Sequence, residues 1–246
     1  LRSLPIGVQS FDNIRNRGYV YVDKTQYIRD LLQGQVYFLS RPRRFGKSLL
    51  LSTLKAYFEG KKELFKGLFL ERGEPELAAA QGREAWQRYP VLHLDLNTGE
   101  YKNAEELKGI IVYHLNLWEE LYGKETSEDT LTLRFAGILR RAYEQTGQQV
   151  VFLVDEYDKP LLQSVNNPEL YEQFRSLLYA FYSNIKSSDQ YIRFVFLTGV
   201  SRFGKLTIHR ESTGNIAGIH GKFAACINQH QIAVAQRHII FRIMQN

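Results

Sequence analysis

The chain has 246 residues, of which 44% are hydrophobic and 24% charged. This length and composition predict a folded protein with one sizeable core and exclude a disordered chain. No apolar run approaches the roughly 20 residues that a transmembrane helix needs, and the first residues have no signal-peptide pattern. The single cysteine, Cys226, excludes an internal disulfide framework and a cysteine-rich zinc site. We therefore expect no membrane association and a cytoplasmic location.

The formal net charge of +6 is unevenly distributed along the chain. Residues 201–246 carry six Lys or Arg and one Glu, whereas the first 200 residues carry 26 basic and 25 acidic side chains. The position of charge says more about partners than its sum does. The main body therefore gives no support for nucleic-acid binding.

Strand and helix patterns alternate along the first 200 residues. Short apolar and β-branched runs predict strands at 35–40, 91–97, 149–155 and 192–199. Apolar residues spaced three and four apart predict helices at 47–60, 103–123, 132–147 and 167–186. Residues 71–90 have a mixed pattern and are expected to form a surface excursion between the first two strands. Alternating strands and helices predict an α/β fold with a mainly parallel central sheet.

The stretch RPRRFGKS, residues 41–48, ends in the Gly-Lys-Ser that closes a phosphate-binding loop. It follows one predicted strand and opens a helix, so that backbone N–H groups would face phosphate. Lys47 would neutralise the β- and γ-phosphates, and the Ser48 hydroxyl would face Mg²⁺. The alternative is a basic turn capped by Ser48. The expected phosphate-binding set is Arg41, Pro42, Arg43, Arg44, Phe45, Gly46, Lys47, Ser48 and Leu49.

Arg41 stands where such a loop normally has its first glycine. Glycine there permits a backbone shape that other residues resist, but Pro42 could fix the turn by locking its own φ and restricting Arg41. The sequence leaves open whether the three arginines of this stretch hold phosphate or are solvated.

Polar residues end two later predicted strands. Asp155 and Glu156 end the third strand. A phosphate-loop enzyme needs one acid at this position to hold Mg²⁺ and often a second one to polarise the attacking water. Thr198 ends the fourth strand, where an ATPase of the additional-strand class places a polar group between the γ-phosphate and water. Each of these residues alone could be a capping or strand-ending group. Together with the loop, they predict a nucleotide site in which Glu156, Lys47 and Thr198 are catalytic and Ser48 and Asp155 hold the metal.

Several stretches taken together resemble a known family. They are LPIGVQSFDNIRNRGYVYVDKTQYI, RPRRFGKS, AYFEGKKELFKGL, YPVLHLDLN, VDEYDKPL and FLTGVSRFGK, and they span residues 1 to about 208. They resemble the bacterial AAA-ATPase-like proteins, which are often joined to a nuclease-like domain of the PD-(D/E)XK type and typically have arginine at the position of Arg41. The resemblance implies a three-layer P-loop fold of the ASCE type, with ATP and Mg²⁺ as cofactors.

The same resemblance implies roles for individual residues. It makes Asp155 the acid on the Mg²⁺ side and Glu156 the catalytic base. It also places Asp23, Lys24 and Thr25 near the adenine, although Thr25 could instead cap the helix that follows it. Asp158 is either an acid supporting the site or a solvated one.

The resemblance fades after Lys205. Residues 209–246 form an atypical basic segment, expected to be truncated or frame-shifted, with no room for a nuclease domain. A fifth strand beside the first has only a weak candidate, residues 237–243, so the sheet is expected to be incomplete at its C-terminal strand. Arg202 could sense phosphate or be solvated.

The favoured function is Mg²⁺-dependent ATP binding and hydrolysis. One alternative is a nucleotide-binding switch or truncated remnant without turnover, and a minor one is a nuclease-associated module that processes nucleic acid. Asp95, Glu106 and Lys108 imitate a nuclease metal site, but Glu106 and Lys108 fall in a predicted helix, whereas that motif needs a strand. The sequence defines neither the oligomeric state nor a protein partner.

Overall fold

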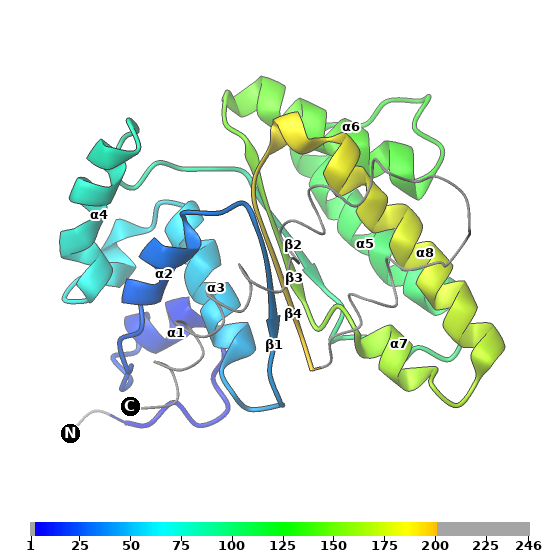
Figure 1. Cartoon of the computed structure of the whole chain (residues 1–246), viewed down its shortest axis with the longest axis horizontal. Coiled ribbons are helices and arrows are strands. Elements are labelled where there is room, and N and C mark those ends of the chain that lie inside the picture. The colour runs from blue at the N-terminus through cyan, green and yellow to red at the C-terminus, as the bar shows by residue number, and fades with distance from the viewer. Residues whose placement is uncertain (1–2, 201–246) are drawn as a thin grey trace, which may run out of the picture. The chain divides into compact units, whose positions relative to one another are not determined.

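The computed structural model describes residues 3–200 of the chain. The candidate fifth strand, Arg202 and the basic segment 209–246 lie outside the described residues. Four strands form one parallel sheet in the order β1-β4-β3-β2 (Figure 1). Their bounds are β1 Val36–Ser40, β2 Val91–Asp95, β3 Val150–Asp155 and β4 Ile192–Gly199. β4 is thus the additional strand, between β1 with its loop and β3 with its acids.

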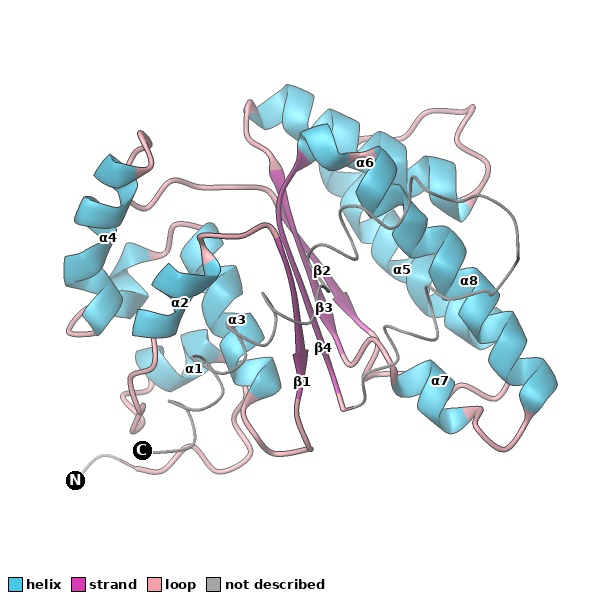
Figure 2. Ribbon diagram, viewed as in Figure 1, coloured by secondary structure: helices cyan, strands magenta, loops and turns pink. Residues whose placement is uncertain are grey.

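Helices cover both faces of the sheet and give three layers (Figure 2). α1 to α4 lie on one side and α5 to α8 on the other. The first group is α1 Phe11–Asn16, α2 Gln26–Leu31, α3 Lys47–Phe58 and α4 Phe69–Ala80, with a 3-10 turn at Lys62–Phe65. The second group is α5 Ala104–Tyr122, α6 Leu131–Thr146, α7 Lys159–Gln163 and α8 Pro168–Ser187, with a 3-10 turn at Asp189–Tyr191. The predicted α/β class and parallel sheet are confirmed.

Side-chain caps explain where the long helices begin. The side chains of Asn103, Thr130 and Asn167 accept hydrogen bonds from the backbone N–H groups of the third residue on, at the starts of α5, α6 and α8. α6 ends where Gly147 takes the left-handed conformation at φ 66°. In residues 3–200, no helix is both long and apolar enough to cross a bilayer.

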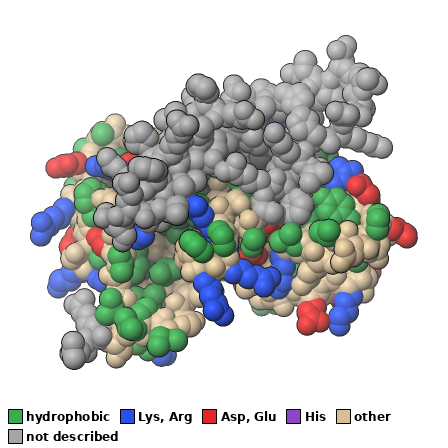
Figure 3. Space-filling model, turned by 60° about the horizontal axis from the view of Figure 1, so that its bottom comes forward, with side chains coloured by type: hydrophobic (Ala, Val, Ile, Leu, Met, Phe, Trp, Pro, Cys, Tyr) green, Lys and Arg blue, Asp and Glu red, His purple; other side chains and the backbone are tan. Residues whose placement is uncertain are grey.

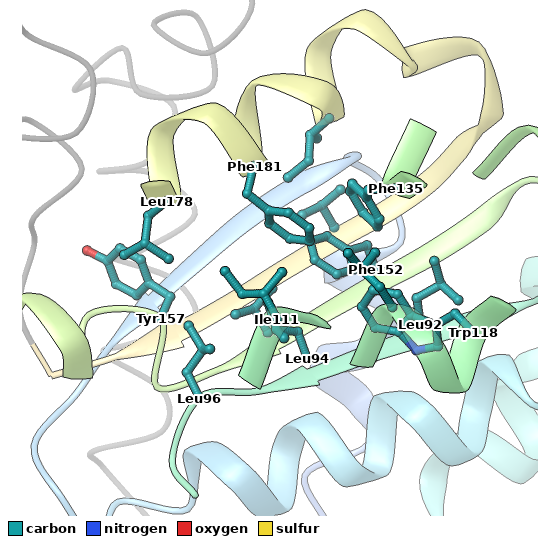
Figure 4. Packing of buried hydrophobic residues seen from close by; sticks show 14 of the residues in the cluster. Leu92, Leu94, Leu96, Ile111, Trp118, Phe135, Phe152, Tyr157, Leu178 and Phe181 are labelled. Atoms are coloured by element: carbon teal, nitrogen blue, oxygen red, sulfur yellow. The ribbon is translucent and has the colours of Figure 1, made fainter. Parts of the chain in front are cut away.

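The core on the α5–α8 side of the sheet combines aliphatic and aromatic side chains (Figure 4). Phe135 of α6 stacks on Phe181 of α8 with ring centroids 4.6 Å apart, and both contact Phe152 of β3. Aromatic pairs at such spacings add about 0.5–1.5 kcal/mol each to the free energy of area burial. The central strand β3 is therefore anchored from α6 and α8.

The segment 71–90 is more than the expected surface excursion. Its first ten residues complete α4, and Glu74, Ala78 and Trp86 are buried. Glu74 accepts hydrogen bonds from Arg83, from the Tyr57 hydroxyl and from the Trp86 backbone N–H. Because these partners satisfy its carboxylate, an acid can lie fully buried in a stretch whose sequence pattern is polar.

Candidate functional site

The loop between β1 and α3 turns through two left-handed residues. Arg44 has φ 68° and Gly46 has φ 77°. Arg41 is not among the described residues with positive φ, and its backbone N–H donates to the carbonyl of Gly199 at 3.0 Å, extending the pairing of β1 with β4. The missing glycine at position 41 therefore has no conformational cost, and the left-handed demand falls on Arg44 instead.

Lys47 is the first residue of α3, and its side chain points back into the loop. Its Nζ donates to the carbonyls of Arg41 at 3.1 Å and Pro42 at 3.3 Å, and lies 3.1 Å from Glu156 Oε1. The residue is 4% exposed. The loop carbonyls and one carboxylate together compensate this buried ammonium group.

The remaining loop residues are more accessible. Phe45 is 62% exposed, Arg43 and Arg44 are exposed, and Ser48 is half-buried in the first turn of α3. A Cβ placed on Gly46 would meet no atom of the described residues within 4 Å. The site lies at the carboxyl ends of the strands, on the face that Figure 3 brings forward, and Lys and Arg side chains project from the described residues of this face. The loop thus offers an open, cationic edge.

The acids at the end of β3 are held by β4. The Thr198 hydroxyl donates to Asp155 Oδ1 at 2.5 Å and accepts from the Glu156 backbone N–H at 3.2 Å. Thr198 is fully buried and Asp155 is 6% exposed. Glu156 has φ 52°, a strained conformation of the kind that concentrates at functional sites. In this structure the Thr198 hydroxyl orients the acids, whereas its predicted contact with the γ-phosphate stays a prediction.

The predicted residues Lys47, Asp155, Glu156 and Thr198 therefore meet at one end of the sheet. Sequence reasoning missed two contributors, Ser40 and Gly199. The Ser40 hydroxyl donates to the Val200 carbonyl at 3.0 Å, and a side chain on Gly199 would collide with Tyr157 and Asp158. The glycine directly after a strand-ending threonine was the available signal for such close packing.

Asp23 and Thr25 lie against the start of α4. Asp23 Oδ2 accepts from the Phe69 backbone N–H at 2.6 Å, and Thr25 Oγ1 accepts from that of Leu70 at 3.1 Å. Thr25 occupies the N-cap position of α2, as the alternative expects, but its side chain makes no capping hydrogen bond into that helix. These side chains satisfy N–H groups at a helix start. The predicted position of residues 23–25 near adenine remains a prediction.

The nuclease alternative has no geometric support. Glu106 and Lys108 lie in α5, as predicted, where Glu106 caps the helix start through the Lys102 backbone N–H. Within residues 3–200, no three His, Cys, Asp or Glu side chains form a metal-binding group by themselves. Glu106 and Lys108 therefore interact within α5 and at its start, and not with a metal-binding group.

A histidine lies on the strand beside the acids. Burial lowers the pKa of His93 on β2, and the charges of Asp95 and Asp155 partly oppose this shift. His93 Nε2 is buried and has no hydrogen-bond partner among the described residues. A neutral imidazole is therefore favoured at this position.

Residues 5–209 match the family model described as a predicted AAA-ATPase. The chain belongs to this AAA-ATPase-like family. It is also 41% identical over 212 residues to the "Uncharacterized protein in vnfD 5'region" of Azotobacter chroococcum mcd 1. That match covers 84% of this chain but 39% of the relative, so the chain spans well under half of the relative's length. No solved structure matches the chain. The family resemblance found in the sequence is confirmed.

Proposed function

We propose that this AAA-ATPase-like chain binds ATP together with Mg²⁺ and hydrolyses it. The observation that carries the proposal is the 3.1 Å approach of Lys47 Nζ to Glu156 Oε1. Lys47 begins the helix after β1 and Glu156 directly follows β3, and β4 lies between these two strands. A phosphate-binding lysine and a carboxylate that can activate water thus meet where a γ-phosphate would lie between them.

The loop supplies the groups that would hold the phosphates. The backbone N–H groups of Phe45, Gly46 and Lys47 would bind phosphate oxygens at the start of α3, and the Lys47 ammonium would add a full charge. Arg41, Arg43 and Arg44 raise the positive charge around the loop, and Pro42 and Leu49 flank it. Arg43 and Arg44 form no ion pair with any described acid. Their charge is therefore available to an anionic ligand.

The oxygen groups near the loop suit Mg²⁺, which prefers hard oxygen ligands. Ser48 offers a hydroxyl and Asp155 a carboxylate of which Oδ1 accepts from Thr198. The bound ion would neutralise phosphate charge. Thr198 orients the carboxylate, so Asp155 is already fixed at the strand end.

The Lys47–Glu156 ion pair suggests how the chain's own groups would act. When Lys47 turns to phosphate, the Glu156 carboxylate loses its ion-pair partner and can accept a proton from a water molecule. Thr198 keeps the Glu156 backbone in place through its hydrogen bond. The same two side chains would thus serve binding first and water activation second.

The test is ATP binding and turnover by the purified protein, with and without Mg²⁺. Lys47→Ala should lose nucleotide affinity, while Lys55→Ala, on the same helix and paired with Glu59 at 2.5 Å, should not. Glu156→Gln should bind ATP but lose turnover by a factor of about 10² or more. Equal affinity of Lys47→Ala and the parent would refute the site, and unchanged turnover of Glu156→Gln would remove its role as base.

A second candidate is a nucleotide-binding switch without turnover. The geometry that favours it is the ion pair of Lys47 with Glu156, in which each charge is compensated without a ligand. In that case the parent protein should bind ATP and show no turnover above the Glu156→Gln background. The same set of measurements separates the two candidates.

A further inference from the structure

The segment Thr198–Val200, where β4 ends, joins the two halves of the site. On one side, the Arg41 backbone N–H donates to the Gly199 carbonyl and the Ser40 hydroxyl donates to the Val200 carbonyl, each at 3.0 Å. On the other side, the Tyr157 backbone N–H donates to the Thr198 carbonyl at 2.9 Å. The phosphate loop and the acid pair are therefore connected through these three residues.

Asp158 holds this segment from the acid side. Its Oδ2 accepts from the Val200 backbone N–H at 2.9 Å, and the residue is fully buried. Of the two outcomes that the sequence left open, the solvated acid is therefore excluded. A carboxylate without access to water must be matched by specific donors, so its position is tightly set.

Gly199 permits this contact. A Cβ on Gly199 would lie 2.6 Å from Asp158 Oδ1 and 2.6 Å from a ring carbon of Tyr157. Both distances are shorter than any real side chain accepts. The residue between Thr198 and Val200 must therefore lack a side chain for Asp158 to reach Val200.

We propose that Asp158 is a positioning residue for the reaction. It fixes Val200, the short segment carries this constraint to Thr198, and the Thr198 hydroxyl sets the backbone of Glu156 beside Lys47. In this proposal Asp158 acts through Val200 and Thr198 rather than directly on phosphate or water. Its catalytic meaning rests on the proposed function, whereas its hold on the Glu156 backbone does not.

The experiment compares Asp158→Ala and Asp158→Asn with the parent in ATP affinity, turnover and backbone hydrogen exchange. Asp158→Ala should lower kcat about tenfold to a hundredfold with little change in ATP affinity, because the reacting groups move while the loop remains. Asp158→Asn keeps an oxygen acceptor for Val200 and should restore most of the turnover. Glu74→Gln, an equally buried acid in α4, is the control for loss of a buried carboxylate and should leave kcat unchanged.

Hydrogen exchange tests the positioning even if the parent hydrolyses no ATP. Asp158→Ala should speed exchange at the Val200 and Glu156 backbone N–H groups, while residues 151–154 of β3 remain protected. Asp158→Asn should preserve protection at both sites. Unchanged exchange at Glu156 in Asp158→Ala would overturn the proposal, and so would an equal kcat loss in Glu74→Gln. Absence of turnover in the parent with the exchange pattern as expected would refute only the hydrolysis.

Discussion

The two strands that carry the site differ in how they are buried. All five residues of β1 are half-buried and the strand lies at the edge of the described sheet, whereas all six residues of β3 are buried between β4 and β2. The exposed loop residues 42–46 therefore precede Lys47, whereas Asp155 ends a strand that is buried throughout. Such an arrangement lets the loop after β1 adjust to a ligand while the acids at the end of β3 stay fixed.

The largest expected effect tests this contrast through stability. Phe152→Ala on β3 removes a ring packed against Phe135 and Phe181 and should lower the free energy of unfolding by about 3–5 kcal/mol. Phe45→Ala in the loop should change it by no more than about 0.5 kcal/mol, because this ring is exposed. Urea unfolding measures both. Similar losses in the two variants would mean that the loop is as tightly packed as the strand.

The next effect concerns the hydroxyl that holds the acids. Thr198→Val keeps the shape but leaves Asp155 Oδ1 and the Glu156 backbone N–H without this partner, at an expected cost of about 1–3 kcal/mol in unfolding free energy. Turnover should fall as well, since both acids lose their orientation. Thr198→Ser keeps the hydroxyl and should retain turnover at a smaller cost in stability. If Thr198→Val hydrolysed ATP as fast as the parent, the orientation of Asp155 and Glu156 by the Thr198 hydroxyl would not matter for the reaction.

Most of the fold followed from local sequence signals. The predicted strands match the observed ones to within two residues, because continuous apolar runs such as residues 149–155 mark strands covered on both faces. Helix ends at Asn103 and Gly147 follow cap chemistry, which is also local. The burial of Glu74 could not be predicted in this way, because its partner Tyr57 lies 17 residues away and in another helix.

The site was predictable in membership but not in geometry. The loop and acid motifs identified Lys47 and Glu156, yet no pattern shows that they pair across the sheet. The burial of Asp158 depends on the backbone of Val200, 42 residues later in the chain. Arg41 stands at the position of the missing glycine, but the residue with the left-handed conformation is Arg44. Arg41 instead pairs with the Gly199 carbonyl, a contact between residues 158 positions apart that the local sequence does not show.

A smaller effect separates conformation from charge in the loop. Arg44→Gly relieves a left-handed conformation that costs about 1–2 kcal/mol, but the freer unfolded chain offsets about 0.5–1 kcal/mol of this gain. We therefore expect a rise of about 0.5 kcal/mol in unfolding free energy, with weaker ATP binding because a cation is lost. Arg44→Ala should weaken binding equally without the gain in stability. Unequal affinities of the two variants would show that backbone shape, and not the guanidinium, governs binding at this position.

The smallest expected effect is the pH dependence of stability that arises from His93 on β2. Burial lowers the pKa of His93, with Asp95 and Asp155 opposing the shift and Lys55 and His114 adding to it. The unfolded chain takes up a proton near pH 6.5 while the folded chain resists it, so stability should fall as pH drops below about 6.5. His93→Leu should flatten this fall between pH 7 and 5.5 and leave stability at pH 8 nearly unchanged, because Nε2 has no described hydrogen bond to lose.

Burial also lowers the pKa of His114, which is present in both proteins, so a residual slope is expected. If the urea midpoints of the parent and His93→Leu changed with pH in parallel, His93 would be solvated. The contrast between a buried strand and an exposed loop would then apply to β3 but not to β2.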